Sequence, residues 1–279
     1  MKKTKLFFGV VTLMLAMAAC TKKEAPLVAG GPNILYTLPQ GSHDYDSIIL
    51  AFQKKYHTYI LYRFNMRDFD ASPLKNGVKN AYLLGPADEA YVGKLLTFLQ
   101  QHWFKYYPDS FLKENLPFKL LLTAEAKYTP KKDSICSACT IYNQITIGNA
   151  SPQLDRMSTV EKKAFVNAIH KTFFQYMKNW NKLIFPEEFG KISNYEIKPD
   201  AKNYQALGYV TKSPGSIVED AFQYILLITS TPKDQLDKGV LDPTIDSSGL
   251  IGKKYKLLTE YYKSKYQIDL QSIGNATTF

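Results

Sequence analysis

Residues 158–178 (STVEKKAFVNAIHKTFFQYMK) form the stretch that most constrains the fold of this chain. Apolar residues recur there at intervals of three and four, which is typical of a helix. Ser158 and Glu161 have the spacing of a capping box at its start. A second apolar row passes through His170 and Phe174, so the helix has apolar residues on both sides. The sequence therefore predicts one long, central and buried helix.

The first residues have the three parts of a secretory signal: three lysines, the apolar run Leu6–Met17, and small residues before a cysteine. Met17–Cys20 resembles a lipobox, so we expect lipidation at Cys20. The alternative is a single-pass anchor, but the run is shorter than the about 20 residues that span a bilayer as a helix. The predicted organisation is a signal peptide (1–19), a lipidated cysteine with a flexible tether (20–33) and a single domain (34–279).

The charge and the catalytic motifs exclude several functions. The chain carries a formal net charge of +10, but its lysines are spread over helix faces and form no basic stripe. An exported protein without such a stripe is not expected to bind nucleic acid. The sequence has no G-x-S-x-G motif and no glycine loop of the phosphate-binding kind. These observations argue against nucleic-acid binding, serine catalysis and phosphate binding.

Two cysteines remain after the lipidation site, Cys136 and Cys139, in the sequence C-S-A-C. Outside the cytoplasm this spacing favours a local disulfide or two free thiols over a redox or zinc site. A zinc site would need two more ligands, and none lies nearby in the sequence. Both the disulfide and the free thiols remain open from the sequence.

Helices and short strands are mixed irregularly along the chain, which favours an α+β fold over a regular βαβ series. Long polar segments at 66–77, 181–215 and 231–248 are expected to be loops or connectors. The predicted helices are 44–56, 86–103, 158–178, 216–229 and 252–267, and the predicted strands are 59–64, 118–123 and 142–147.

Several stretches, in this order and spacing, resemble one family: the substrate import-associated zinc metallohydrolase lipoproteins of Gram-negative outer membranes. The stretches are FQKKYHTYILYRF, HWFKYYP, FKLLLT, ITIGNA, AFVNAIHKTFFQYM, GYVTKSPGSIVEDAFQYI and KLLTEYYKSKYQIDL, within residues 44–273. The resemblance implies a zincin-like α+β fold. In that fold a central buried helix lies beside a small mixed sheet, and the C-terminal half is mostly helical.

The chain departs from the family where the chemistry takes place. A zincin helix carries H-E-x-x-H, because two histidines four residues apart can reach one zinc and the glutamate activates water. Here His170 matches the first ligand, Lys171 replaces the general base and Phe174 replaces the second histidine. The third-ligand segment reads EDAFQ, with Gln223 at the position of the likelier glutamate. Glu219 is the remaining weak candidate, and its spacing from Ser216 also suits a capping box.

Two questions about these positions stay open in the sequence. If Lys171 is buried, Asp220 or Glu219 is its expected partner; otherwise its ammonium group reaches solvent. The other histidines do not provide obvious replacement ligands, because they lie far earlier in the chain. They are His43, His57 and His102, and the last two are expected at helix ends.

We therefore expect a lipid-anchored relative of zinc metallopeptidases that keeps the cleft but has lost the catalytic residues and binds no zinc. Its expected role is that of an accessory or binding protein of an outer-membrane nutrient importer, on the periplasmic or the cell-surface face. One alternative is an active metallohydrolase with zinc on non-standard ligands. Another is a glycan- or peptide-binding lipoprotein, for which the candidate aromatic residues are Trp103, Tyr106, Tyr107, Trp180, Tyr195 and Tyr204.

Overall fold

The computed structural model describes residues 36–69, 82–128 and 134–276. It separates into two units, Met1–Thr37 and Leu38–Phe279, and all elements below belong to the second. The predicted signal peptide, Cys20 and the tether lie outside the described residues. Within the described residues, no helix is both long and apolar enough to cross a bilayer.

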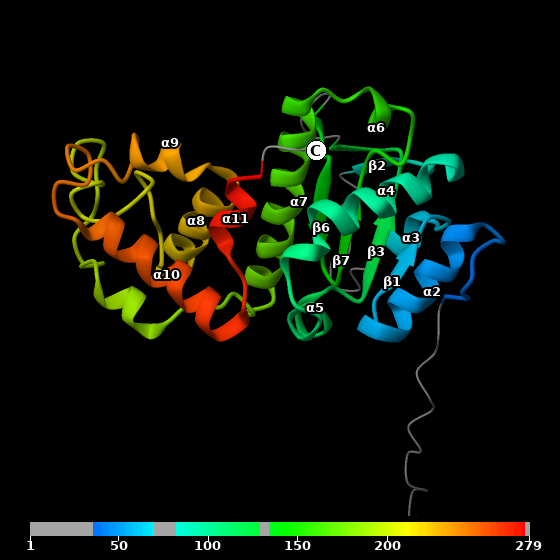
Figure 1. The fold of residues 1–279 in the computed structure, drawn as a ribbon, viewed down its shortest axis with the longest axis horizontal. Helices are drawn as coiled ribbons and strands as arrows, with labels where there is room; N and C mark the ends of the chain where they lie inside the picture. Colours follow the sequence, from blue (N-terminus) through cyan, green and yellow to red (C-terminus); the bar gives the residue numbers. More distant parts are fainter. Residues whose placement is uncertain (1–35, 70–81, 129–133, 277–279) are drawn as a thin grey trace, which may run out of the picture. The chain divides into compact units, whose positions relative to one another are not determined.

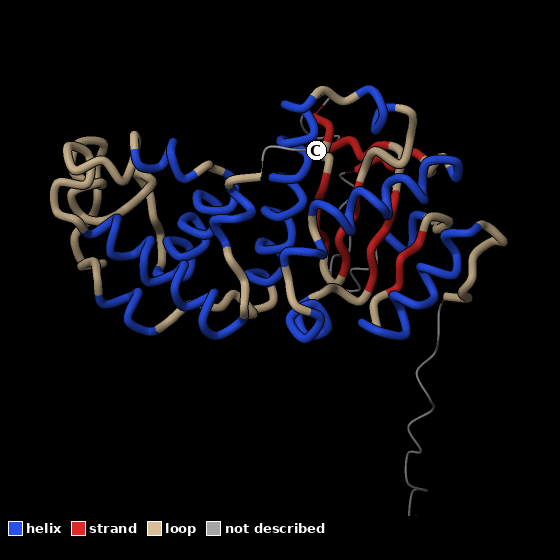
Figure 2. Tube along the Cα trace, viewed as in Figure 1, coloured by secondary structure: helices blue, strands red, loops and turns tan. Residues whose placement is uncertain are grey.

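A four-stranded mixed sheet forms the centre of the N-terminal half (Figures 1 and 2). Its strands follow the order β1-β3-β7-β6; the first three are parallel, and β6 is an antiparallel edge strand. Leu120 pairs with Ile60 on one side and with Ile145 on the other, and all three side chains are buried. Parallel strands are typically apolar on both faces, as here. The bounds are β1 (Tyr59–Leu61), β3 (Lys119–Leu122), β6 (Ala138–Ile141) and β7 (Gln144–Ile147).

A second, antiparallel sheet has the order β2-β4-β5. This sheet was not predicted from the sequence, because its strands are short and partly polar. They are β2 (Tyr82–Gly85), β4 (Glu125–Tyr128) and β5 (Ser134–Ile135).

The helices of the N-terminal half surround the first sheet (Figure 1). Asp88 begins α4 by accepting a hydrogen bond from the Ala90 amide. The elements are α2 (Asp44–Tyr56), α3 (Met66–Phe69), α4 (Glu89–His102), η1 (Phe104–Tyr106), α5 (Asp109–Asn115) and α6 (Gln153–Arg156).

The predicted central helix is α7 (Thr159–Asn179), which begins at the capping box of Ser158 and Glu161. It packs on β6 and β7 on one side and on α8 on the other, so it separates the sheet from the C-terminal helices (Figure 1). The prediction of a central buried helix is confirmed. The C-terminal elements are η2 (Glu187–Lys191), α8 (Ile217–Ser230), α9 (Lys233–Asp237), α10 (Leu250–Tyr266) and α11 (Leu270–Gly274).

Several predicted elements differ from the structure. The predicted strand 59–64 ends at Leu61, and the predicted loop 66–77 begins with the short helix α3. The segment 142–147 is not one strand, because a tight turn at Tyr142 and Asn143 joins β6 to β7. The predicted loop 231–248 contains α9, whose start follows Pro232. The α+β class and the mostly helical C-terminal half agree with the prediction.

Candidate functional site

His170 lies near the middle of α7 and is completely buried. Its Nε2 is 3.0 Å from the carbonyl oxygen of His102, which can only accept, so Nε2 carries the proton and donates. The other ring nitrogen, Nδ1, therefore accepts a hydrogen bond from the Tyr107 hydroxyl at 2.7 Å. Both nitrogens are thus used inside the protein. Burial lowers the pKa of His170 to about 3, so the imidazole is neutral at physiological pH.

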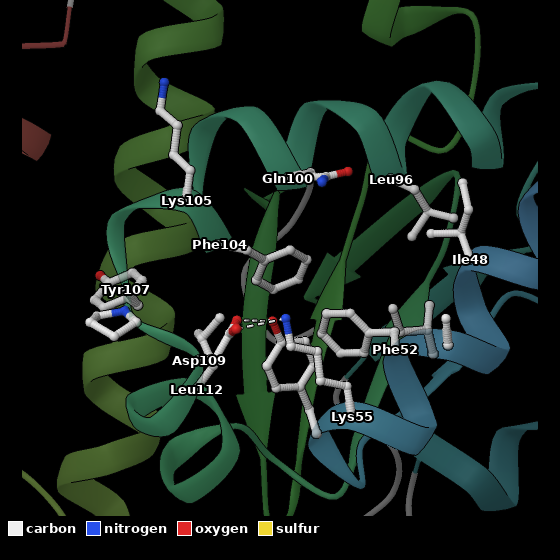
Figure 3. Close-up of a pocket in the computed structure, with 14 residues that line it drawn as sticks. Ile48, Phe52, Lys55, Leu96, Gln100, Phe104, Lys105, Tyr107, Asp109 and Leu112 are labelled. Carbon is white, nitrogen blue, oxygen red and sulfur yellow. Dashed lines mark hydrogen bonds and ion pairs between the residues drawn. The ribbon is translucent and has the colours of Figure 1, made fainter.

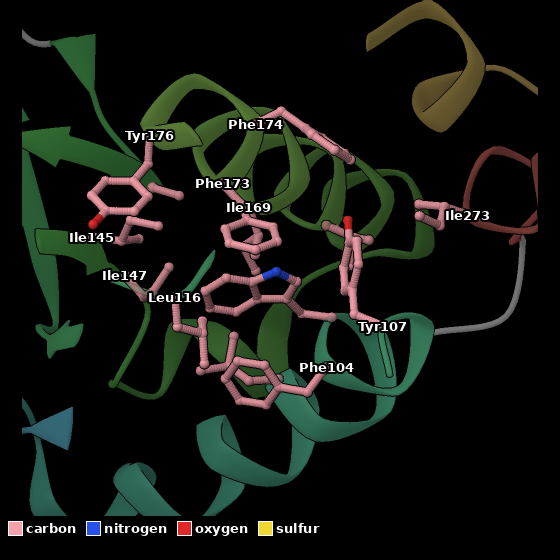
Figure 4. Close-up of a cluster of buried hydrophobic side chains, with 14 of the residues drawn as sticks. Phe104, Tyr107, Leu116, Ile145, Ile147, Ile169, Phe173, Phe174, Tyr176 and Ile273 are labelled. Atoms are coloured by element: carbon pink, nitrogen blue, oxygen red, sulfur yellow. The ribbon is translucent and has the colours of Figure 1, made fainter. Parts of the chain in front are cut away.

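Phe174, one helical turn after His170, stands where a zincin helix has its second histidine. Its side chain is fully buried, and its ring contacts those of Tyr107 and Tyr262 at centroid distances of 6.2 and 6.5 Å. Figure 4 shows Phe174 and Tyr107 as parts of one hydrophobic cluster around α7. Carbon therefore occupies the volume in which a second nitrogen ligand would be needed.

Lys171 is exposed, which settles the question of its surroundings in favour of solvent. The two acidic residues considered as its partners are paired with other lysines. Glu219 bonds Lys178 at 2.5 Å, and Asp220 bonds Lys254 at 2.6 Å. Of the two possibilities left open by the sequence, Lys171 therefore follows the second, and neither ion pair includes it.

Glu219 is held by hydrogen bonds rather than aimed at a metal position. Its carboxylate accepts from Lys178 Nζ and, at 2.8 Å, from Gln223 Nε2. Burial raises the pKa of this carboxyl, but the bonds from Lys178 and Gln223 outweigh it and lower the pKa. Ser216 does cap α8 by accepting from the Glu219 amide at 3.2 Å. The reciprocal half of the predicted capping box is replaced by the ion pair with Lys178.

The other candidate residues are separated from His170 or serve the backbone around it. His43 begins α2, His57 ends it, and His102 ends α4 and offers its carbonyl to His170. Within the described residues, no group of three His, Cys, Asp or Glu side chains is placed to hold a metal ion.

Cys136 and Cys139 are free thiols in the structure. The hydrogen bond from Cys139 lowers the pKa of Cys136, and the same bond raises that of Cys139. Of the two arrangements left open by the sequence, the structure has the reduced one.

A buried ionic cluster in the C-terminal half was not predicted as a site. The Lys254 ammonium and the Asp220 carboxylate are at most 1% exposed, and Tyr195 donates to the same carboxylate oxygen at 2.7 Å. Four aromatic rings surround the ammonium at 4.6 to 5.6 Å, those of Phe189, Tyr195, Tyr209 and Tyr224. The cluster joins α8, α10 and the connector 181–215, which explains how that connector is ordered. Its signal in the sequence was the density of tyrosines in the connector.

A groove of about 580 Å³ lies between α2, α4 and α5 (Figure 3). Phe52 and Phe104 face each other in it, and the Lys55–Asp109 ion pair of 2.7 Å closes one end. Tyr107 contributes to its wall, but the His170 ring behind it is sealed from solvent. Tyr106 and Tyr107 contact the buried His170 ring, so the expected cleft does not reach this residue.

The comparisons with known proteins decide the family. A family model described as "putative zinc-binding metallo-peptidase" matches residues 44–271, which is most of the chain. The chain belongs to this metallo-peptidase family. A solved structure titled "putative zinc-binding metallo-peptidase" from Bacteroides caccae is similar with a TM-score of 0.52 and 18% identity, over 82% of this chain and 88% of that one. That likeness supports the shared fold. No curated protein matches.

The residues present do not fit the zinc that the family description implies. A catalytic zinc needs three protein ligands and an open position for water. At the matching positions this chain offers an imidazole with both nitrogens engaged, a phenyl ring and a carboxylate bound to Lys178. The chain thus has the fold of the family, with His170 and Phe174 packed in the core and Glu219 in an ion pair.

Proposed function

We propose that this protein is a non-catalytic, lipid-anchored relative of the zinc metallo-peptidases, acting as an accessory or binding protein of an outer-membrane nutrient importer. The main support for the proposed loss of catalysis is the environment of the His170 ring. The ring donates to His102, accepts from Tyr107 and is closed off from solvent. Zinc binding there would require breaking the Tyr107 bond and displacing Phe174 from the core.

The replacement of the general base supports the same proposal. In a zincin the glutamate after the first histidine takes a proton from the bound water. Lys171 stands at that position and is exposed on α7. A charged ammonium group cannot accept a proton, and it repels a cation. The usual mechanism therefore lacks its base as well as its ligands.

The anchor and the partner rest on the sequence. Met17–Cys20 resembles a lipobox, and the residues after Cys20 form a polar, Gly- and Pro-containing tether. Two or more acyl chains hold a protein stably on a membrane. Such a tethered domain without catalytic residues suits a role in binding material for an importer in the same membrane.

Metal content and cleavage test the catalytic part of this proposal. The full-length protein is dialysed against buffer with trace zinc, its zinc is measured by mass spectrometry, and a mixed peptide library is incubated with it. We expect substoichiometric zinc and no cleavage at any zinc concentration. His170→Ala serves as the matched variant. One tightly held zinc per chain that is lost in this variant, or cleavage that chelation abolishes, would contradict the proposal.

Metabolic labelling with a palmitate analogue tests the anchor. We expect label in the wild-type chain and none in Cys20→Ser, with Cys136→Ser as a control that keeps the label. An unlabelled wild-type protein would overturn the anchor, and recovery of the importer's outer-membrane components with the labelled protein would support the role. Purification of the labelled protein without any of those components counts against the role.

A further inference from the structure

Two aromatic side chains lie together at the surface, at one end of the first sheet. Tyr142 is 48% exposed and sits in the turn between β6 and β7, and Trp180 is 39% exposed at the end of α7. Their ring centroids are 5.3 Å apart. Of the six aromatic residues singled out in the sequence as candidate binding groups, Trp180 is the one that is exposed.

Tyr142 keeps an unfavourable backbone conformation. The β6–β7 turn has two residues, and Tyr142 has φ of +49°, where a bulky side chain is uncommon and glycine is favoured. A residue chosen for folding alone would be glycine at this point of the turn. The tyrosine therefore places a ring outside the fold at a cost to the backbone, and such outliers cluster at functional sites.

The two residues hold each other in place. The Trp180 indole N–H donates to the Tyr142 carbonyl at 2.8 Å, and the Trp180 ring also contacts that of Tyr176 at 6.3 Å. Because the indole N–H is used within the protein, Trp180 presents its ring surface and not a donor. The result is a rigid pair of exposed rings, fixed before any ligand arrives.

The residues that flank Trp180 in the sequence, and the residue that follows Tyr142, are amides. Asn143 follows Tyr142, and Asn179 and Asn181 flank Trp180 in the sequence and are exposed. Gln175 donates to Asn179 at 2.7 Å on the same side of α7. Phe118, 43% exposed, precedes β3, and the amide after it bonds the Asn143 carbonyl at 3.4 Å. A third exposed aromatic side chain therefore lies at this end of the sheet, at the start of β3.

We propose that Tyr142 and Trp180 form a platform that binds a neutral oligosaccharide; this rests on the proposed binding role of the protein. The apolar face of a sugar ring stacks on an aromatic ring. Each hydroxyl group of the sugar can both donate and accept hydrogen bonds, so it needs partners of both kinds. Amide side chains provide both. The extension toward Phe118 suits a chain of several sugars better than a single one.

The chemistry of the surface favours a saccharide over a lipid surface or a peptide. A membrane contact would gain from several free lysines beside the rings. Lys178 is paired with Glu219, whereas Lys182 keeps its charge while it donates to the Glu114 carbonyl at 2.9 Å, so the sequence around Trp180 supplies one free cation and no cluster. An apolar peptide would need aliphatic pockets, and the neighbours of the rings in the sequence are amides. The amide-bordered aromatic pair thus fits a polyhydroxylated ligand.

Affinity electrophoresis tests the platform. The full chain is run through gels containing amylopectin, laminarin, xyloglucan or galactomannan. We expect at least one of these polymers to retard the wild type. Trp180→Ala and Tyr142→Gly should each lower the affinity about tenfold or more, as for a central aromatic contact.

Tyr142→Gly is informative because it removes the ring and relieves the positive φ. It should fold at least as stably as the wild type while binding less. Tyr91→Ala, on α4, is the matched control and should be retarded as the wild type is.

Fluorescence gives a second measurement, because the chain has two tryptophans and Trp103 is fully buried. Binding of oligosaccharides from the retarding polymer should change emission from Trp180, and Trp180→Phe should abolish that change.

Equal retardation of wild type and Tyr142→Gly, or no retardation by any of the four polymers, would overturn the platform. Binding of the Cys20→Ser protein to phosphatidylethanolamine–phosphatidylglycerol vesicles that is lost when Trp180→Ala is added would assign the rings to a membrane contact instead. Zinc content and peptide cleavage do not depend on these variants, so the platform and the loss of catalysis can fail separately.

Discussion

A neutral imidazole that donates through one nitrogen and accepts through the other can satisfy two buried groups at once. His170 does so for the His102 carbonyl at the end of α4 and for the Tyr107 hydroxyl. Histidine is a common metal ligand, but here the His170 side chain connects α7 to the end of α4 and to the segment that follows it. This connection requires the uncharged form of the ring, so its contribution to stability depends on pH.

Acid should destabilise the protein through His170. In the unfolded chain a histidine takes up a proton near pH 6.5, whereas in the folded protein its pKa is about 3. Protonation therefore favours the unfolded state as the pH falls from about 6.5 toward 3. From pH 7 to pH 5 this group should lower the free energy of unfolding by about 2 kcal/mol. The loss, measured by urea unfolding at both pH values, should be smaller by that amount in His170→Gln, and His57→Gln should retain it. An unchanged pH dependence in His170→Gln would contradict this account.

Removing Lys254 should be more damaging than removing a surface lysine. Burial raises the pKa of Asp220 and lowers that of Lys254, which reflects the cost of burying both charges. Lys254→Met would leave the Asp220 carboxylate buried without its cation, at a cost of about 3–5 kcal/mol in unfolding free energy. Asp220→Asn in the same chain should recover part of this loss. Lys256→Met, at an exposed lysine of the same helix, is the control and should change stability little.

At the scale of the elements, α7 and α8 begin with the same sequence device and use it differently. Ser158 and Glu161 exchange both hydrogen bonds of a capping box at the start of α7. At the start of α8, Ser216 caps, but Glu219 extends to Lys178 on α7. Glu219 thus links α8 to α7 and does not complete a capping box at the start of α8.

The two serines should therefore differ in their contribution to stability. Ser158→Ala removes the hydroxyl of a complete box and should lower the unfolding free energy by about 1 kcal/mol. Ser216→Ala should cost less, because the Lys178–Glu219 bond that holds α8 to α7 persists. Ser158→Asp should retain most of the wild-type stability, since a carboxylate also caps. Equal losses in both alanine variants, measured by urea unfolding, would show that the Lys178–Glu219 bond does not support the start of α8.

The sequence predicted the long elements well and the short ones poorly, for physical reasons. The caps and apolar periodicity of α7 and α8 are local signals, so their bounds agree with the structure to about one residue. The β6–β7 turn was missed because Tyr142 is not a residue that such a turn favours. At the candidate site, the sequence showed which ligands were lost. The sequence could not show that Lys178, two turns after His170, forms an ion pair with Glu219, because that pairing depends on how α8 packs against α7.

At the scale of the whole molecule, zinc should not stabilise the fold. A ligand present at a hundred times its dissociation constant raises the unfolding free energy by about 2.7 kcal/mol. Since the metal positions of α7 are occupied by packed side chains, micromolar zinc should leave the melting temperature of the wild type unchanged. The control variant combines Phe174→His with Gln223→Glu and so restores two zinc-binding side chains. A zinc-dependent rise in the melting temperature of this variant would show that the measurement detects zinc bound at these positions. A zinc-dependent rise in the wild type would contradict the assignment.

The last helix, α11, is also part of the core. Leu270 and Ile273 are buried, α11 packs against α8, and a side chain at Gly274 would come within 2.2 Å of the Ile228 carbonyl oxygen. Lys163 on α7 donates to the carbonyl of Gly274 at 3.0 Å. The segment 270–274 therefore completes the core between α7 and α8. Truncation before residue 270 should expose the apolar surface of α8 and make the domain more sensitive to proteases.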